Sequence, residues 1–577
     1  MPRFIRTGLT TALLAAIILI LNGGWSGLII APLVGAGAGI VITSQEKWKT
    51  RADAARLGLK AGITGGIVLL VAQIFHDTLL AKIAGLPPQP IDRMIIVAVG
   101  ALIVSTLTGF LFGGAQSLAS TPRLIFTFTF LGLFLLIYPF IDQATELGWI
   151  GQMIAVLIFV LLALGLNIVV GYAGLLDLGY AAFFAIGAYT TGLLSSPQIG
   201  LHVNFWLAIW VAAAIAAFSG IVLGAPTLPL RGDYLAIVTL GFGEIVPIVF
   251  RNLTAIVIRE PITGTCLVGC PKPFNLTAGE QGVNPIGRPV LPVIDFAQIN
   301  LGDAQVIARI AMLGIILALG FIIFRSLALK MQAGRQTFLV WGGFGALVLA
   351  LVYLFFFAPI GEFQAGKYLP WYYLILFIIA FSVFFINRLR SSRLGRAWTA
   401  IREDELAAAS MGVDIVQTKL LAFSMGATFS GFAGAFYAAY ISAIFPSTFD
   451  FSISVIVLCM VILGGQGNMI GVILGGLIIT AADRLFLPQF AALSQSILKT
   501  SVFPLIQNEG LRDFFIGVFD PSQLRLLLFG LTLVIMMLVR PEGLVPSTYR
   551  RREFHEADET KNAPMESEVI QPASASK

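Results

Sequence analysis

Residues 388–415 read RLRSSRLGRAWTAIREDELAAASMGVDI, and an apolar run lies on each side of them, at about 371–387 and 416–441. Even on the most lenient scale, one charged side chain at the centre of a bilayer costs roughly 2.5–3.5 kcal/mol. The four consecutive charges of residues 402–405 therefore cannot lie in hydrocarbon. We predict two membrane spans joined by a polar segment on the cytoplasmic side.

A helix is expected within this polar segment. Its composition favours helix, and a recurrence of four residues places small side chains on one helical face, along Arg396, Ala400, Asp404, Ala408 and Gly412. Such a face can approach another protein closely. An ordinary basic loop would explain the arginines, but it would not explain an acidic triplet followed by alanines.

The composition of the whole chain excludes a soluble domain. Hydrophobic residues make up 58% and charged residues 11% of the 577 positions, and the mean hydropathy is +0.92, so too little polar surface remains to cover a globule. The net charge of +6 comes from short basic clusters between apolar runs, which is typical of membrane proteins and not of nucleic-acid binding. His76, His202 and His555 are too scattered to predict a metal site. Cys266 and Cys270 share one polar loop, where they either form a disulfide or stay as two thiols.

Apolar segments long enough to be membrane helices recur along the chain. A full span needs about 20 residues, and a half-helix or re-entrant segment needs fewer. We count about sixteen segments, of which those near residues 8, 452 and 468 are short enough to be partial spans. They run approximately over 8–22, 25–43, 61–81, 93–113, 124–141, 149–170, 179–196, 204–224, 234–250, 304–325, 338–358, 371–387, 416–441, 452–464, 468–482 and 524–540.

The basic residues predict the orientation of these spans, because short loops rich in Lys and Arg stay on the cytoplasmic side. With the N-terminus inside, the basic stretch 45–60 and the arginines of 388–402 fall inside, and so does the C-terminus. The long loops 251–303 and 483–523 then face outward. Short loops without Lys or Arg fall outside as well, at 142–148, 197–203 and 442–451.

Three regions are predicted along the chain. Residues 1–145 carry five apolar segments of their own and are interpreted as an appended membrane module, residues 146–545 form the main membrane domain, and the polar residues 546–577 form a disordered cytoplasmic tail. Arg3 and Arg6 before the first apolar run would also suit a signal peptide. We expect a retained first helix, because no convincing small-residue cleavage site follows it.

Four stretches of the sequence resemble one family. The stretch 395–412, GRAWTAIREDELAAASMG, is similar almost residue by residue to the wording GRAxxAIREDExAAxxMG of the cytoplasmic coupling loop in LivM-type permeases of branched-chain amino acid ABC importers. The same family is resembled by GLNIVVGYAGLLDLGYAAFFAIGAY at 165–189, LRGDYLAIVTLGFGEI at 230–245 and RPEGL at 540–544. Together these stretches run from about 149 to 545, so residues 1–145 are not needed for the resemblance.

The resemblance implies a fold, a function and partners. The fold would be an all-α polytopic ABC importer permease with roughly 14–16 membrane segments, in the bacterial inner membrane. It would carry branched-chain or hydrophobic amino acids by alternating access, together with a second, LivH-like permease subunit, two ATP-binding subunits and a periplasmic or lipid-anchored binding protein. Because the partner would hydrolyse ATP, no cofactor and no enzymatic activity are expected on this chain. The coupling helix would dock on the ATPase through Arg396, Arg402, Glu403, Asp404, Glu405, Ala407, Ala408 and Gly412.

One stretch imitates a nucleotide site. Residues 361–367, GEFQAGK, begin like a phosphate-binding loop, but Tyr368 stands where a Ser or Thr should bind magnesium. The stretch also lacks a strand before it and a helix context after it, and the predicted orientation places it outside. We therefore predict no nucleotide site here, so the energy for active transport must come from a partner or from an ion gradient.

Polar residues among the apolar runs are candidates for the substrate path, because a buried ionisable group needs a partner or water. They are Asn167, Asp177, Glu244 and Gln466. Glu244 precedes Pro247 in mid-run and suggests a broken helix near a cavity, with a structural ion pair to an arginine of a neighbouring span as the alternative. The glycines around Gln466 suggest a tight re-entrant turn.

Small residues recur every four positions in two places, which predicts seams of close helix packing. One series is Gly426, Ser430, Gly434, Ala438 and Ser442, and the other is Gly467, Gly471 and Gly475.

The alternatives to a branched-chain amino acid permease differ in what they require. A urea or amide ABC permease would share the architecture. An ion-coupled secondary transporter should show paired intramembrane carboxylates and two matching inverted halves, neither of which the sequence shows clearly. A channel is favoured only by the glycine-rich turns.

Overall fold

The computed structural model describes residues 3–289 and 363–497, residues 543–545 and a few single positions between 510 and 538. Short gaps within these ranges lie at 23–25, 46–49, 81–90, 117–119, 146–147, 198–199, 228–232, 256–257, 260–265, 269–274 and 364–365. The predicted segments 304–325 and 338–358, most of 524–540 and the predicted tail 546–577 lie outside the described residues.

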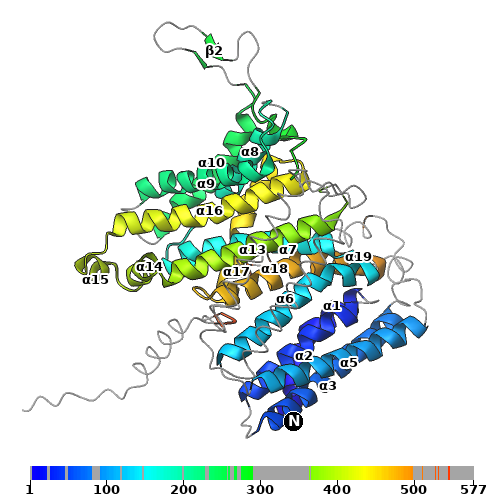
Figure 1. Cartoon of the computed structure of the whole chain (residues 1–577). Coiled ribbons are helices and arrows are strands. Elements are labelled where there is room, and N and C mark those ends of the chain that lie inside the picture. The colour runs from blue at the N-terminus through cyan, green and yellow to red at the C-terminus, as the bar shows by residue number, and fades with distance from the viewer. Residues whose placement is uncertain are drawn as a thin grey trace, which may run out of the picture. The chain divides into compact units, whose positions relative to one another are not determined.

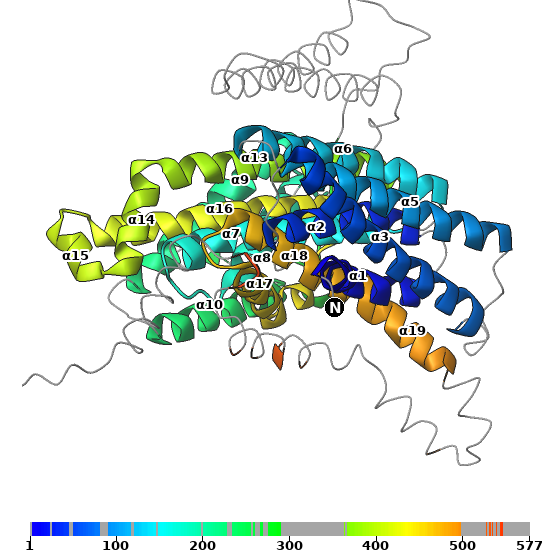
Figure 2. The ribbon, with the colours of Figure 1, turned by 90° about the horizontal axis from the view of Figure 1, so that it is seen from below.

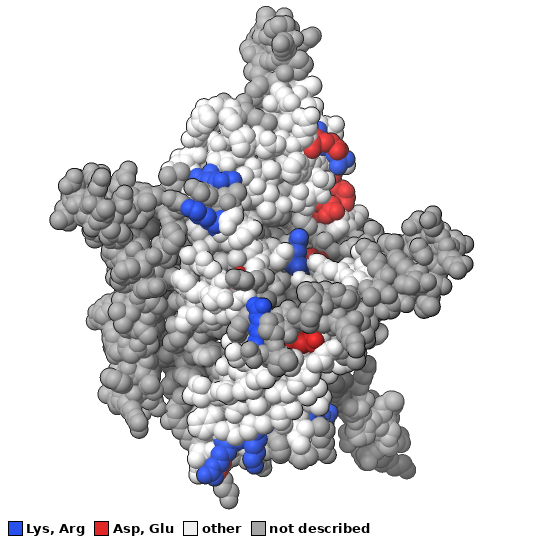
Figure 3. Space-filling view, turned by 90° about the vertical axis from the view of Figure 1, so that its right-hand side faces the viewer, with Lys and Arg blue, Asp and Glu red and all other residues white. Residues whose placement is uncertain are grey.

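The described chain is helical, apart from one small antiparallel pair of strands (Figure 1). Ten of its helices are long and apolar enough to cross a membrane, and the shorter apolar helix α8 (Tyr180–Ser195) accompanies them. The face in Figure 3 shows broad areas without charged side chains, as contact with lipid requires. The predicted class, an all-α polytopic membrane protein, is confirmed.

The chain divides into two compact units. Unit 1 comprises Met1–Leu157, Arg288–Ile378 and Thr480–Arg525, and unit 2 comprises Ile158–Gly287, Ile379–Ile479 and Leu526–Lys577. Unit 1 therefore contains the predicted N-terminal module together with segments from later in the chain.

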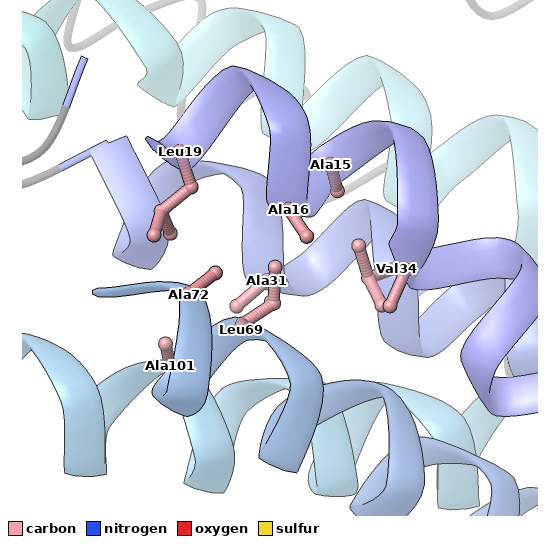
Figure 4. Packing of buried hydrophobic residues seen from close by; sticks show 9 residues of the cluster. Ala15, Ala16, Leu19, Ala31, Val34, Leu69, Ala72 and Ala101 are labelled. Atoms are coloured by element: carbon pink, nitrogen blue, oxygen red, sulfur yellow. The ribbon is translucent and has the colours of Figure 1, made fainter. Parts of the chain in front are cut away.

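Unit 1 is built around four N-terminal helices. They are α1 (Arg3–Asn22), α2 (Ser26–Gln45), α3 (Arg51–Phe75, continued by the π-helix η1, His76–Leu80) and α5 (Ile91–Ala115). Their shared core holds mostly small side chains, including Ala16, Ala31 and Ala72 around Leu19 and Leu69 (Figure 4). Small residues let helix backbones approach closely, which drives association where lipid removes the hydrophobic contrast.

Unit 1 also contains helices from later in the chain. They are α6 (Ser120–Thr145), the start of α7 (Ile150–Leu166), the start of α13 (Tyr368–Ser391) and α19 (Leu487–Ile497). The hydroxyl groups of Tyr372 and Tyr373 donate to the carbonyl oxygens of Leu135 and Leu136, at 3.0 and 2.7 Å, and so tie α13 to α6. The loop predicted for 483–523 is wrong at its start, because α18 (Met469–Ala481) continues through η6 (Ala482–Phe486) into α19.

Unit 2 is organised around the helix α16 (Ile415–Ile441), which packs against α8 and α9 (Phe205–Thr227). The predicted seam on α16 is confirmed along its glycines. A Cβ atom on Gly434 would collide with the Phe184 carbonyl, and one on Gly426 would lie 2.5 Å from a side-chain carbon of Val169. Ser430, midway between these two glycines, is fully buried.

The second predicted seam joins α17 (Phe451–Gly464) to α18. A Cβ atom on Gly475 would lie 2.7 Å from the backbone nitrogen of Gly464, and Gly471 and Gly464 are packed backbone to backbone. The helix α10 (Asp233–Asn252) is continuous through Pro247, so the break suggested at Glu244 is wrong. Pro247 removes one backbone donor, and the rest of the helix tolerates that loss.

Unit 2 has loops at two opposite ends of its helices. One end carries 173–179, 392–414 and 464–468; the other carries 196–197, 200–204, 275–287 and 442–450. At the second end Val283 and Ile444 form an isolated antiparallel bridge. The two strands β1 (Ile258–Arg259) and β2 (Cys266–Val268) pair in the loop after α10. Cys270 lies outside the described residues, so its pairing with Cys266 stays a prediction.

Gly187→Leu is expected to destabilise unit 2, because a Cβ atom at Gly187 of α8 would lie 2.6 Å from the Cα of Gly431 on α16. Overpacking of this kind costs about 1–3 kcal/mol, so the melting temperature of the detergent-solubilised protein should fall. Gly132→Leu in α6 is the matched control, since a Cβ atom there meets nothing within 4 Å. Equal melting temperatures for the two variants would contradict the seam.

Candidate functional site

The polar segment between α13 and α16 forms two short helices, which we call the docking loop (Ser392–Asp414). They are α14 (Arg393–Glu403) and α15 (Glu405–Ser410), and both lie at one end of α16 (Figures 1 and 2). The single helix predicted here is wrong, because Asp404 adopts an extended backbone with φ −152°. Its carboxylate accepts hydrogen bonds from the backbone nitrogens of Leu406 and Ala407, at 2.8 and 3.0 Å. Asp is a strong N-cap, so it starts a new helix where composition alone would continue the old one.

The break redistributes the small residues of the docking loop. Ala408 is buried, whereas Ala407 is exposed. Gly412 follows the end of α15 with φ +82°, a backbone conformation that glycine adopts without strain. The exposed large apolar side chains are Leu406 and Met411, at 69% and 85% of their full accessibility. The sequence interpretation missed both, although two large apolar residues in a strongly polar segment are a signal of contact with another protein.

Two internal contacts fix the docking loop on the first turns of α16. The Lys419 ammonium lies 2.6 Å from the Glu405 carboxylate, with only 7% of the lysine side chain exposed. The indole nitrogen of Trp398, a fully buried residue, donates to the Thr418 carbonyl at 2.8 Å. A buried amine is stabilised by such a partner, so the loop is held in one position. Glu403 remains exposed beside Asp404.

The arginines of this region have different partners. Arg396, which is exposed, donates to the Ser391 carbonyl at 3.0 Å within the same loop region. Arg402 donates from Nη1 to the carbonyl oxygen of Gly171, 231 residues away in sequence, at 2.5 Å. Gly171 lies in the π-helix η2 (Asn167–Tyr172), which continues α7. The docking loop is therefore bonded to the end of a membrane span.

The end of η2 meets a glycine-rich turn, residues 464–468, which we call the glycine turn. The Asn167 side-chain oxygen accepts a hydrogen bond from the Gly467 backbone nitrogen at 2.9 Å. The glycine turn also binds the chain after the last predicted span, because the Asn468 amide donates to the Val545 carbonyl at 3.0 Å. The Leu544 nitrogen donates to the Leu463 carbonyl at 2.8 Å. Residues 543–545, which include the end of the RPEGL stretch, thus pack on this turn.

The four predicted path residues occupy two places. Asn167 is fully buried and meets the glycine turn that contains the half-buried Gln466. Asp177 lies in the loop 173–179, which is bonded to α10 because the Leu178 nitrogen donates to the Thr239 hydroxyl at 3.0 Å. Glu244 also belongs to α10, and its side chain is exposed on the surface of this chain.

The Asp177 carboxyl is fully buried. One oxygen accepts a hydrogen bond from the Gly179 nitrogen at 2.9 Å, and the other has no partner among the described residues. Removal from water penalises the charged form, so burial raises the pKa of this carboxyl to about 7, against the smaller opposing effect of the Gly179 bond.

Two further expectations concern ligands. Within the described part of the chain, no group of three or more His, Cys, Asp and Glu side chains could hold a metal ion. The phosphate-loop imitation at 361–367 lies mostly outside the described residues.

Comparison with known proteins agrees with this architecture. The family model described as branched-chain amino acid transport system / permease component matches residues 149–266 and 293–537. The chain is 34% identical over 393 residues to the high-affinity branched-chain amino acid transport system permease protein LivM of Escherichia coli, and 33% identical over 398 residues to that of Salmonella typhimurium. Each match covers 68% of this chain and 68% of the relative. The xylose transport system permease protein XylH of Haemophilus influenzae is 28% identical over 185 residues, 30% of this chain and 47% of the relative. No solved structure matches.

The family match begins at residue 149, where the resemblance in the sequence also begins, and leaves the first 148 residues outside it. It includes the docking loop, η2 and the glycine turn. With ten membrane-length apolar helices among its described residues, the chain is a multi-pass inner-membrane protein. It belongs to the branched-chain amino acid transport permease family.

Proposed function

We propose that this chain is the permease subunit of an ATP-driven importer of branched-chain or hydrophobic amino acids. The observation that carries the proposal is the docking loop, which exposes Leu406 and Met411 while its Asp404 and Glu405 carboxylates are bonded internally. An apolar surface on a rigid loop outside the membrane is suited to binding another protein. Both LivM relatives are named as branched-chain amino acid permeases, which supports the substrate class.

We propose four partner subunits for this chain, and we assign binding sites to two kinds of them. Two ATP-binding subunits would serve the transporter, one of them bound at the docking loop, and a second permease subunit would complete the substrate path. A periplasmic or lipid-anchored binding protein would deliver substrate at the opposite loops. This chain needs no cofactor in that scheme, because the partner hydrolyses ATP, and both of its termini would be cytoplasmic.

We propose that the transporter works by alternating access. When the ATP-binding subunits close, the bound docking loop would move with them. Because the loop is fixed to α16 through Lys419 and Trp398, and to η2 through Arg402, that movement would reach the helices that line the path. A rigid connection is required for this, since a loose loop would absorb the displacement.

The docking of the ATP-binding subunit should fail when Leu406→Asp and Met411→Asp are combined. Each buried apolar side chain contributes about 1.5–3 kcal/mol, so the amount of ATP-binding subunit that co-purifies with tagged permease should fall at least about tenfold. Leu201→Asp is the matched control, because Leu201 is 57% exposed in the opposite loops. Retention of the ATP-binding subunit by the double variant would show that the docking loop is not part of the interface.

Uptake by the reconstituted complex should separate the substrate classes. Labelled leucine should accumulate with ATP and the ATP-binding subunits present, and labelled urea should not. Accumulation of urea alone would favour the amide-type alternative. Transport by the purified chain without any companion subunit would instead indicate an ion-coupled transporter.

Glu244 is the strongest candidate for substrate contact among the proposed path residues. Only 28% of the membrane-length stretch of α10 is buried within this chain, and Glu244 lies on its exposed part. The space around α10 is open nearby as well, since a Cβ atom on Gly241 would meet nothing within 4 Å. A carboxylate facing hydrocarbon is costly, so this face of α10 should be covered by protein or water in the complex. We propose that it faces the substrate path, where the carboxylate would attract the ammonium group of an amino acid.

Glu244→Gln should raise the KM for leucine uptake about tenfold or more, since a hydrogen bond to a charged group is worth about 1.5–3 kcal/mol. Subunit assembly should not change. Glu280→Gln is the control. Glu280 lies beyond the end of α10, its side chain is 75% exposed, and it pairs with Arg251 in the last turn of that helix. A reduced yield of the second permease subunit, with an unchanged KM in the complexes that still assemble, would show that Glu244 makes a structural ion pair instead.

A further inference from the structure

Two arginines that flank most of α14 contact the same end of a membrane span. Arg402, in the last turn of α14, donates to the Gly171 carbonyl at 2.5 Å. The guanidinium of Arg390, at the end of α13, lies 5.9 Å from the centre of the Tyr172 ring. Carbonyl groups at a helix C-terminus lack partners within the helix and carry partial negative charge, so they attract cations.

Arg402 occupies a slot formed by three backbone segments. A Cβ atom on Gly174 would lie 2.7 Å from Cγ of Arg402, and one on Gly467 would lie 3.3 Å from its Nη1. Gly174 has φ +72°, a conformation that side chains rarely adopt. The slot therefore depends on glycine at both positions, and it places the guanidinium between η2 and the glycine turn.

Asn167, the first residue of η2, makes a second contact between η2 and the glycine turn. Its side-chain oxygen accepts from the Gly467 nitrogen, and a Cβ atom on Gly171 would lie 2.6 Å from that same nitrogen. η2 and the glycine turn are thus joined by the Asn167 hydrogen bond, and the Arg402 guanidinium, which is bonded to η2, lies against Gly467 of the turn. Single-turn π-helices such as η2 are frequent at functional sites, where they interrupt the regular hydrogen-bond ladder of a helix.

We propose that Arg402 is the positioning residue that makes the docking loop, η2 and the glycine turn move together, with Asn167 as the second link. This inference rests on the proposed function, since it assumes that an ATP-binding subunit displaces the docking loop. A guanidinium suits the task because it is planar and always charged, so it can donate to the Gly171 carbonyl and still fit beside Gly467 of the glycine turn. Asn167 then acts by holding the glycine turn and does not bind substrate directly.

The test is to separate ATP hydrolysis from transport in the full reconstituted complex with its binding protein. Arg402→Met should retain the ATP-binding subunit and keep basal ATP hydrolysis within about twofold, while leucine transported per ATP falls at least about tenfold, the factor expected for one charge-assisted hydrogen bond. Arg402→Lys should recover part of that ratio, because an ammonium can bond one carbonyl but lacks the fork.

Arg388→Met is the matched control and should keep the ratio of the parent protein. Arg388 is an exposed arginine of the same region, whereas Arg402 is half-buried, and the Arg388 guanidinium lies over Phe384 of its own helix, at 5.8 Å. Asn167→Ala should lower the ratio in the same direction as Arg402→Met. An unchanged ratio for Arg402→Met would overturn the inference.

The remaining outcomes separate this inference from the proposed function. If Arg402→Met loses the ATP-binding subunit, Arg402 belongs to the docking surface, so the inference fails while the proposed function stands. If the parent chain never binds an ATP-binding subunit, the proposed function itself fails. If Arg402→Met does not accumulate as folded protein, Arg402→Lys decides, and an unchanged ratio in that variant overturns the inference.

Discussion

The cost of placing charge in hydrocarbon constrains the rest of this structure. It forces residues 402–405 out of the bilayer and so fixes where α13 ends and α16 begins. At that boundary the charged side chains still need partners, and they find them within the protein. Glu405 pairs with Lys419, Asp404 caps α15, and Arg402 binds the carbonyl end of η2. Each of these bonds also removes freedom from the docking loop.

Close packing through small residues is the second constraint, and both units use it. Helices in lipid gain little from hydrophobic contrast, so they associate where glycine and alanine let backbones meet. In unit 2 the same glycines do more than pack. Gly174 and Gly467 leave the space that Arg402 occupies, so the packing of the broken spans and the anchoring of the docking loop depend on the same positions.

Local patterns predicted the helical class, the seams on α16 and the place of the docking loop, because hydropathy and small-residue spacing are properties of neighbouring residues. Contacts between distant residues could not be predicted in this way: Arg402 and Gly171 are 231 residues apart, and nothing near either one indicates the other. The break at Asp404 was missed because capping competes with helix propensity and the four-residue recurrence suggested one continuous face. The opposite error occurred at Pro247, where the sequence suggested a break but α10 is continuous.

The central claim is that the exposed side of the docking loop meets an ATP-binding subunit in the cytoplasm. Site-specific photo-crosslinking in intact cells tests it most directly, with a photoreactive residue at position 411 and a second one at position 201 in the opposite loops. We expect position 411, where Met411 is 85% exposed, to form an adduct with the ATP-binding subunit, and position 201 to form none with it. An adduct between position 411 and a periplasmic protein, or an ATP-binding subunit captured from position 201 and not from 411, would contradict the account.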